Sequence, residues 1–90
     1  MQEDQACPLC MGKAECWVED FGNRLHFFCE RCGEFEVSRK VKDLLSTSQA
    51  MRDSSLQKVQ AAPPNTFAEF TFRFGTGIAL EYQQKRNPGS

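Results

Sequence analysis

Four cysteines in two pairs are the residues of this chain whose types and spacing suggest a chemistry. Two residues separate Cys7 from Cys10 and Cys29 from Cys32, and eighteen residues lie between the pairs. Two intervening residues allow one tight turn to direct both thiolates toward the same point, with backbone amides aimed at the sulfurs. Gly33 can adopt the positive φ that closes such a turn. The double spacing therefore predicts one metal ion held by four thiolates, whereas either pair alone would be a weak signal.

The two other candidate ligands are better interpreted as packing residues. In the predicted strand, Cys16 lies on the same side as Ala14 and Val18, and residues 15, 17 and 19 lie on the other side. We therefore interpret Cys16 as a small apolar filler rather than a ligand or reactive thiol. His26 lies among aromatic residues, and a packed or surface imidazole is favoured because four thiolates already saturate a tetrahedral ion. Such a closed shell leaves no position for an activated water, which argues against a hydrolytic centre.

The composition indicates a small protein with reduced thiols. The chain has 90 residues, and its five cysteines are an odd number that fits a disulfide framework poorly. The sequence shows neither an apolar signal segment near Met1 nor an apolar run of membrane length, so we expect a cytoplasmic protein without a membrane partner. A chain this short often needs a metal for stability. Residues 1–36 carry eight acidic and three basic residues, whereas residues 37–90 carry four acidic and eight basic ones.

Alternation of apolar and polar residues predicts a small antiparallel sheet that brings the two cysteine pairs together. The pattern indicates strands at residues 14–19 and 24–29, joined by a turn at residues 20–23. A third short strand is expected at residues 34–37, directly after the second pair. A hairpin of this kind lets cysteines that are distant in sequence converge on one ion.

Over residues 7–38 the chain resembles the zinc ribbon, or rubredoxin-like, family, in which cysteine pairs on two turns are joined by a small antiparallel sheet. It is also similar to small zinc ribbons of bacterial and phage proteins, in which a run like Glu34-Phe35-Glu36-Val37-Ser38 follows the last cysteine. The resemblance implies one structural Zn²⁺. Rubredoxins hold a single iron with the same four sulfurs, so electron transfer is a lesser alternative. Met11 departs from the rubredoxin pattern, which usually has a glycine there.

Residues 39–62 form a predicted helical segment. Apolar residues at helical spacing form an amphipathic stripe at its N-terminal end, and Ser38 is a suitable N-cap. The members of this stripe are Val37, Val41, Leu44 and Leu45. A polar run then interrupts the stripe, which predicts two helical pieces or one interrupted helix ending before Pro63-Pro64. A loose connector over residues 49–60 is the alternative.

Two alternating runs, residues 66–74 and 78–82, predict a C-terminal β-hairpin with Gly75-Thr76-Gly77 as its loop. This loop would pair Phe74 with Ile78 and place an apolar row on one face. The row consists of Phe70, Phe72, Phe74, Ile78, Leu80 and Tyr82, with Phe72 opposite Leu80 and Phe70 opposite Tyr82. Because a bare row of this size invites association, it needs a cover, either the helical stripe of the same chain or a second copy or foreign protein.

Together these elements predict an α+β fold in one compact domain. Residues 1–38 would form the zinc ribbon, residues 39–62 one or two helices, and residues 66–83 a β-hairpin packed on the rest. We also expect residues 87–90 to be a loose end.

The functional hypothesis that fits these expectations is a small structural-zinc protein acting through protein–protein contacts, as an adaptor or inhibitor. Its partner would be another protein or a second copy, bound through the apolar row of the hairpin. Nucleic-acid binding by the helical segment is an alternative, carried by Arg39, Lys40, Lys42, Arg52 and Lys58. The acidic chain and the net negative charge of a zinc tetrathiolate weigh against it. No enzymatic activity is predicted, because a single histidine cannot build a catalytic network and no phosphate-binding loop is visible.

Overall fold

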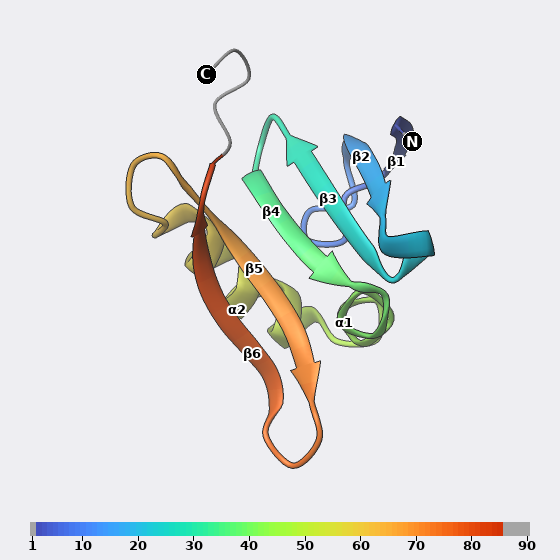
Figure 1. The fold of residues 1–90 in the computed structure, drawn as a ribbon, viewed down its shortest axis with the longest axis vertical. Coiled ribbons are helices and arrows are strands. Elements are labelled where there is room, and N and C mark those ends of the chain that lie inside the picture. Colours follow the sequence, from blue (N-terminus) through green and yellow to red (C-terminus); the bar gives the residue numbers. More distant parts are fainter. Residues whose placement is uncertain (1, 86–90) are drawn as a thin grey trace.

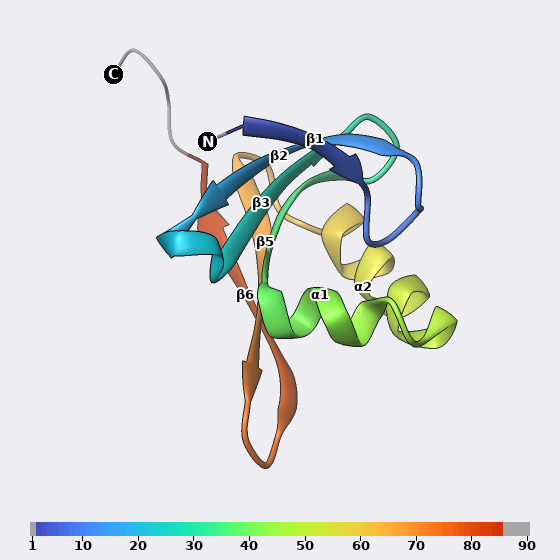
Figure 2. The same ribbon diagram turned by 90° about the vertical axis from the view of Figure 1, so that its right-hand side faces the viewer.

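The computed structural model describes residues 2–85, which form one six-stranded sheet with two helices packed on a single face (Figures 1 and 2). The strands lie in the sheet in sequence order: β1 (Gln2–Ala6), β2 (Lys13–Glu19), β3 (Arg24–Cys29), β4 (Gly33–Ser38), β5 (Thr66–Arg73) and β6 (Gly77–Gln84). The helices α1 (Arg39–Leu45) and α2 (Gln49–Gln60) connect β4 to β5. The architecture is therefore α+β, as predicted, whereas the loose end expected at residues 87–90 lies outside the described residues.

The sheet is larger than predicted and mixed rather than wholly antiparallel. Strands β1 to β4 pair antiparallel, β5 pairs with β4 in parallel, and β6 returns antiparallel to β5. The parallel pairing places Phe35 beside Ala68 and Val37 beside Phe70. Parallel neighbours need a long crossover connection, which the two helices supply. The C-terminal hairpin consequently continues the sheet that carries the cysteine pairs, a pairing that the sequence pattern did not predict.

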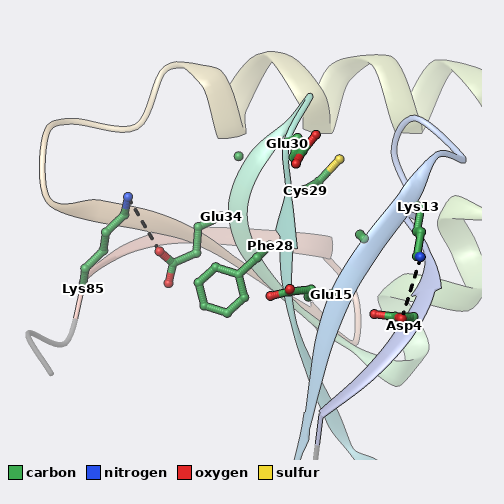
Figure 3. Close-up of a pocket in the computed structure, with 10 residues that line it drawn as sticks. Asp4, Lys13, Glu15, Phe28, Cys29, Glu30, Glu34 and Lys85 are labelled. Carbon is green, nitrogen blue, oxygen red and sulfur yellow. Dashed lines mark ion pairs between the residues drawn. The ribbon is translucent and has the colours of Figure 1, made fainter.

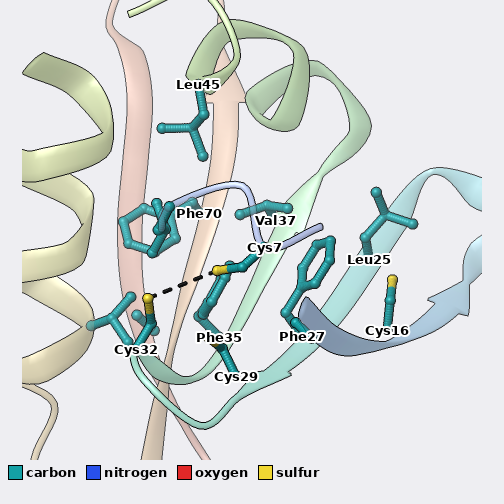
Figure 4. Close-up of a cluster of buried hydrophobic side chains, with 14 of the residues drawn as sticks. Cys7, Cys16, Leu25, Phe27, Cys29, Cys32, Phe35, Val37, Leu45 and Phe70 are labelled. Carbon is teal, nitrogen blue, oxygen red and sulfur yellow. Dashed lines mark hydrogen bonds between the residues drawn. The ribbon is translucent and has the colours of Figure 1, made fainter. Parts of the chain in front are cut away.

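The helix-facing side of the sheet forms the core. Alternation along the strands sends Leu25, Phe27, Phe35 and Val37 to this side, where each is at most 4% exposed, as part of the buried cluster drawn in Figure 4. Helix α1 adds Val41 and Leu45, which are fully buried, while Leu44 of the predicted stripe is half-buried. The stripe and the strands therefore meet in one continuous apolar layer.

Both helices begin at a serine that caps the first turn. Ser38 Oγ accepts a hydrogen bond from the backbone amide of Val41 (3.2 Å), and Ser48 Oγ accepts one from Met51 (3.2 Å). The Ser38 cap was predicted and is confirmed. The second helix confirms two helical pieces and excludes the loose connector over residues 49–60.

The hairpin is present, but its predicted register is wrong. Phe72 lies opposite Ile78 and Phe70 opposite Leu80, whereas the predicted partners were Leu80 and Tyr82. Arg73 pairs with Gly77, so the three-residue loop begins at Phe74. Two glycines here have positive φ: Gly75, at 86°, lies in the middle of the loop, and Gly77, at 84°, is the first residue of β6. A shift of two positions keeps each side chain on its face, which is why the periodicity alone did not reveal it.

Candidate metal centre

The four paired cysteines converge at one end of the sheet. Their sulfur atoms all lie within 4.8 Å of one another, with 3.8 Å between the sulfurs of Cys7 and Cys32 and 3.5 Å between those of Cys10 and Cys29. Figure 4 shows the first of these contacts. A tetrahedral ion with metal–sulfur bonds of about 2.3 Å requires sulfur–sulfur edges of about 3.8 Å. The donor set and its spacing therefore fit one thiolate-bound metal ion, and all five cysteines are free of disulfide bonds.

The first turn is shaped by backbone hydrogen bonds and by an unusual residue. The amide of Cys7 donates to the carbonyl of Gly12 (2.6 Å), and the amide of Met11 donates to the carbonyl of Cys7 (2.8 Å). Met11 has φ of 65°, so it occupies the left-handed conformation that glycine adopts at lower cost. The amide of Gly12 lies 3.4 Å from Cys10 Sγ and donates to it. The second turn uses Gly33, whose φ of 107° confirms the role predicted for it.

The local environment shifts the pKa values of the cysteine thiols in different directions. Burial raises the pKa of Cys7 to about 11 and also raises the pKa of Cys32. Burial acts in the same direction on Cys29, but hydrogen bonds from the amides of Cys32 and Arg31 and from neighbouring cysteines lower its pKa below the ordinary value. Metal binding at neutral pH therefore has to displace protons from the buried sulfurs, and it becomes less favourable as the pH falls.

Cys16 lies outside the sulfur cluster, as predicted. Its side chain is fully buried on the helix-facing side of β2, opposite Phe27, and Figure 4 shows it apart from Cys7, Cys29 and Cys32. Burial raises the pKa of this thiol. Cys16 therefore behaves as a small apolar core residue, because a protonated and inaccessible thiol is a poor nucleophile.

His26 forms a charged cluster with Glu34 and Glu36 that the sequence pattern does not predict. The imidazole is 9% exposed, with Nε2 at 2.6 Å from Glu34 Oε2 and Nδ1 at 3.3 Å from Glu36 Oε1. Although burial lowers the pKa of His26, the two carboxylates outweigh it and the net shift is upward. The same contact lowers the pKa of Glu36 to about 2, and Arg24 lies 3.8 Å from that carboxylate. The histidine is thus a packed residue with both ring nitrogens engaged, not a metal ligand.

A hollow of about 740 Å³ opens beside this cluster, on the sheet face that the helices do not cover (Figure 3). Its charged lining consists of Asp4, Glu15, Glu30, Glu34, Lys13 and Lys85. Ala14, Phe28, Cys29 and Gly33 complete the lining. Both lysines already face carboxylates, with Lys13 at 4.0 Å from Asp4 and Lys85 at 3.6 Å from Glu34. The excess of carboxylates gives this face an acidic field, which disfavours phosphate groups.

The basic residues considered for nucleic-acid binding are divided between the two helices. Most of them contact their own chain: Arg39 Nε donates to Gly22 O (3.0 Å), Lys42 Nζ to Gln5 Oε1 (3.2 Å) and Arg52 Nη1 to Leu45 O (2.7 Å). Lys40 Nζ lies 5.5 Å from the centre of the Phe72 ring. Lys58 contributes its carbonyl to a hydrogen bond from Tyr82 (2.8 Å). Four of the five basic side chains, those of Arg39, Lys40, Lys42 and Arg52, therefore make contacts within their own chain.

The apolar row of the hairpin is only partly covered by the helices. Phe70 is 1% exposed, while Phe72, Ile78 and Leu80 are half-buried. Phe74 is 95% exposed in the loop, and its predicted pairing with Ile78 is wrong because Phe72 takes that position. Tyr82, opposite Ala68 and away from the tip, is 39% exposed although its hydroxyl reaches α2. Phe70 is therefore the member of the row that belongs to the core, and the end near the tip is uncovered.

Comparison with protein families, curated proteins and solved structures gives no match. The resemblance to zinc ribbons therefore rests on the cysteine pairs and their geometry. Neither described helix combines the length and apolar character that crossing a membrane requires.

Proposed function

We propose that this chain is a small protein built on one structural Zn²⁺, bound by Cys7, Cys10, Cys29 and Cys32 in the manner of a zinc ribbon. The observation that carries the proposal is the sulfur cluster, whose spacing of 3.5 Å and 3.8 Å suits zinc–thiolate bonds. Four protein ligands leave no open position for substrate or activated water, so the zinc acts on the fold rather than on a reaction. A reducing compartment such as the cytoplasm keeps these thiols available for the metal.

We further propose that the protein acts as an interaction module, an adaptor or inhibitor, through the uncovered end of the hairpin. Phe74 projects from the β5–β6 loop almost fully exposed, and Phe72 packs edge-on beside it with ring centres 5.7 Å apart. Aromatic side chains of this kind are frequent anchors of protein interfaces, because they bury a large area with few rotatable bonds. Nucleic-acid binding is less well supported, since most of the basic helix residues are engaged within the chain.

Metal content in a pair of cysteine variants tests the structural part of the proposal. We expect one zinc per chain in the wild type, loss of zinc and of folded structure in Cys29→Ser, and retained zinc in Cys16→Ser. Cys16 is the matched control because it is equally a buried cysteine. Full zinc in Cys29→Ser would show that the ligand set is wrong. A red absorbing centre in the purified protein would instead identify iron and favour rubredoxin-like electron transfer.

Affinity capture with two aromatic variants tests the interaction part. Phe74→Ser is expected to lose proteins that the wild type retains, whereas Phe21→Ser is expected to retain them. Phe21 is a suitable control because it is also a fully exposed phenylalanine at a loop tip, between β2 and β3. Equal retention by both variants would remove the hairpin tip from the proposed interface.

A further inference from the structure

We infer that β6 is a pairing edge for a second copy of this chain, and that two copies join antiparallel through β6 to form one continuous twelve-stranded sheet. The inference rests on the proposed function as an interaction module and names the partner. It concerns the strand edge, whereas the surface at Phe74 is the loop tip. In the described residues β6 has β5 as its neighbour on one side and no strand on the other.

The two edges of the sheet differ in a way that favours pairing at β6. The opposite edge, β1, has five residues and carries Glu3 and Asp4, and short charged strands resist association. Strand β6 has eight residues, and Glu81 is its one charged residue. It contains neither lysine nor proline, the residues that commonly protect an edge. Among residues 2–85 no strand pairs with the outer edge of β6, so its backbone groups there can meet an incoming strand.

The side chains of β6 are complementary to themselves in an antiparallel register centred on Leu80. Successive residues of β6 point to opposite faces of the sheet, and facing residues of two antiparallel strands point to the same face. A two-fold axis perpendicular to the sheet must therefore set one residue opposite its own copy, and we name each register by that residue. An axis at Leu80 places Ile78 opposite the partner's Tyr82 and Ala79 opposite the partner's Glu81. Apolar residues then meet on the helix side, and no like charges face each other. An axis at Glu81 would set two carboxylates face to face, which disfavours that register.

The shape of the hairpin suits this arrangement. The loop end of β5 and β6 extends beyond both helices (Figures 1 and 2), and Phe72 and Ile78 there are only half-buried. The other end of β6 is attached to α2 by the hydrogen bond from Tyr82 to Lys58 O. Antiparallel pairing brings the helix-covered end of one copy beside the uncovered end of the other. Each copy thereby supplies apolar cover where its partner lacks it.

Solution mass as a function of concentration tests the inference on the zinc-loaded protein. Sedimentation or light scattering is expected to show a shift from 10.2 kDa toward twice that mass. The concentrations should run from about 10 µM to about 1 mM, since a single strand edge is a small interface and gives a weak dimer. A mass that stays at 10.2 kDa throughout this range would overturn the inference.

Charge substitutions at Ala79 test the register. Ala79→Glu creates two like-charge pairs with the partner's Glu81 and is expected to weaken dimerisation about tenfold, while Ala79→Lys should leave it equal or tighter. Thr71→Glu is the matched control, because Thr71 lies opposite Ala79 on the same face but one strand in from the edge. It is expected to change dimerisation less than about threefold.

Further results distinguish pairing through β6 from binding through the hairpin tip. A dimer that responds alike to Ala79→Glu, Ala79→Lys and Thr71→Glu would use another surface, and the inference would be wrong. A monomer that still captures a different protein through Phe74 would overturn the dimer and leave the proposed function standing. A dimer whose Phe74→Ser variant captures as much as the wild type would support the edge pairing and count against the hairpin tip.

Discussion

Met11 is the residue at which the metal-binding turn carries backbone strain. It has positive φ without being a glycine, and its side chain is largely exposed, so packing does not explain the choice of residue. A left-handed residue with a Cβ costs about 1–2 kcal/mol relative to glycine. The cluster holds this conformation because the hydrogen bonds between Cys7, Met11 and Gly12 close the turn around the sulfurs.

Met11→Gly is therefore expected to stabilise the zinc-bound protein by about 1 kcal/mol, because the strain disappears while the turn keeps its hydrogen bonds. Greater flexibility of glycine in the unfolded chain will offset part of this gain. Thermal unfolding at fixed zinc concentration measures the effect. Met11→Ala removes the same side chain but keeps a Cβ, so it should show no gain. Equal stabilisation by both substitutions would mean that the side chain, not the backbone, is the cause.

His26 should make stability depend on pH in a defined window. Its pKa in the folded protein lies above the ordinary value of 6.5, because Glu36 and Glu34 favour the imidazolium. The stabilisation is fully present below pH 6.5, the value for the unfolded chain, and is lost as the pH rises through the raised pKa. Glu36 stays ionised throughout this window, since its pKa is about 2.

We expect the free energy of unfolding to decrease above pH 6.5 in the wild type and to be flatter in His26→Gln, which cannot become charged. Chemical denaturation in excess zinc across this range measures both proteins, and the difference between them cancels the pH dependence of the metal site. A titration of the imidazole followed by NMR provides an independent value. Parallel pH profiles for the two proteins would exclude His26 as the source.

Among individual residues, the cluster of four cysteines could be predicted from the sequence, but the histidine cluster could not. The cysteine spacing is local, because each pair lies in one turn. The contacts of His26 join β3 to β4, and the two glutamates look in sequence like ordinary residues on a solvent-facing side. Glu34 and Glu36 alternate with Phe35 as in any half-buried strand, so periodicity gives their face but not their partners.

Among the elements, the β5–β6 hairpin combines a core strand with a projecting arm. Phe70 packs under the helices at 1% exposure, whereas Phe74 in the same element is 95% exposed. The parallel pairing of Val37 with Phe70 ties the buried end to β4. One hairpin thus contributes both to stability and to the candidate interaction surface.

Phe70→Ala is expected to lower the free energy of unfolding by about 3–5 kcal/mol, because it leaves a cavity in a packed core. Phe74→Ala should change it by less than about 0.5 kcal/mol, since the ring is exposed. Chemical denaturation of both variants at saturating zinc measures the contrast. Similar losses in the two variants would contradict the assignment of Phe70 to the core and of Phe74 to the uncovered end.

The positions of the hairpin strands could be predicted from the sequence, but their register could not. Alternation located both strands and their apolar face correctly. The register was wrong because it depends on which residues form the loop, and a glycine with positive φ can also sit inside a strand, as Gly77 does. Strand β1 was missed because its polar sequence carries no apolar alternation, and its pairing with β2 depends on partners distant in the chain.

In the molecule as a whole, the metal site and the apolar core are one structure. Cys7, Cys29 and Cys32 belong to the same buried cluster as Phe35 and Phe70. Losing the metal would leave mutually repelling thiolates or buried thiols at the end of this core. A small chain has little other stability to compensate, because it buries a limited part of its surface.

Exhaustive chelation is therefore expected to unfold the protein, and restoring zinc should refold it. Structural zinc contributes roughly 10–16 kcal/mol in zinc-finger peptides, which is comparable to the whole stability of a typical domain. Circular dichroism together with metal analysis follows both steps. A cooperative thermal transition in the metal-free chain, at the temperature of the native protein, would refute the dependence.

The parallel pairing of β4 and β5 has a consequence for how the chain acquires its structure. Phe35 and Ala68, which lie side by side, are 33 positions apart in the sequence, while the other strand pairs close through short turns. Contacts between distant segments form slowly, because a long loop must be closed before they contribute. We expect the antiparallel strands β1–β4 and the β5–β6 hairpin to form early and separately during refolding. The pairing of β4 with β5 across the helical connection should then be the step that limits the rate.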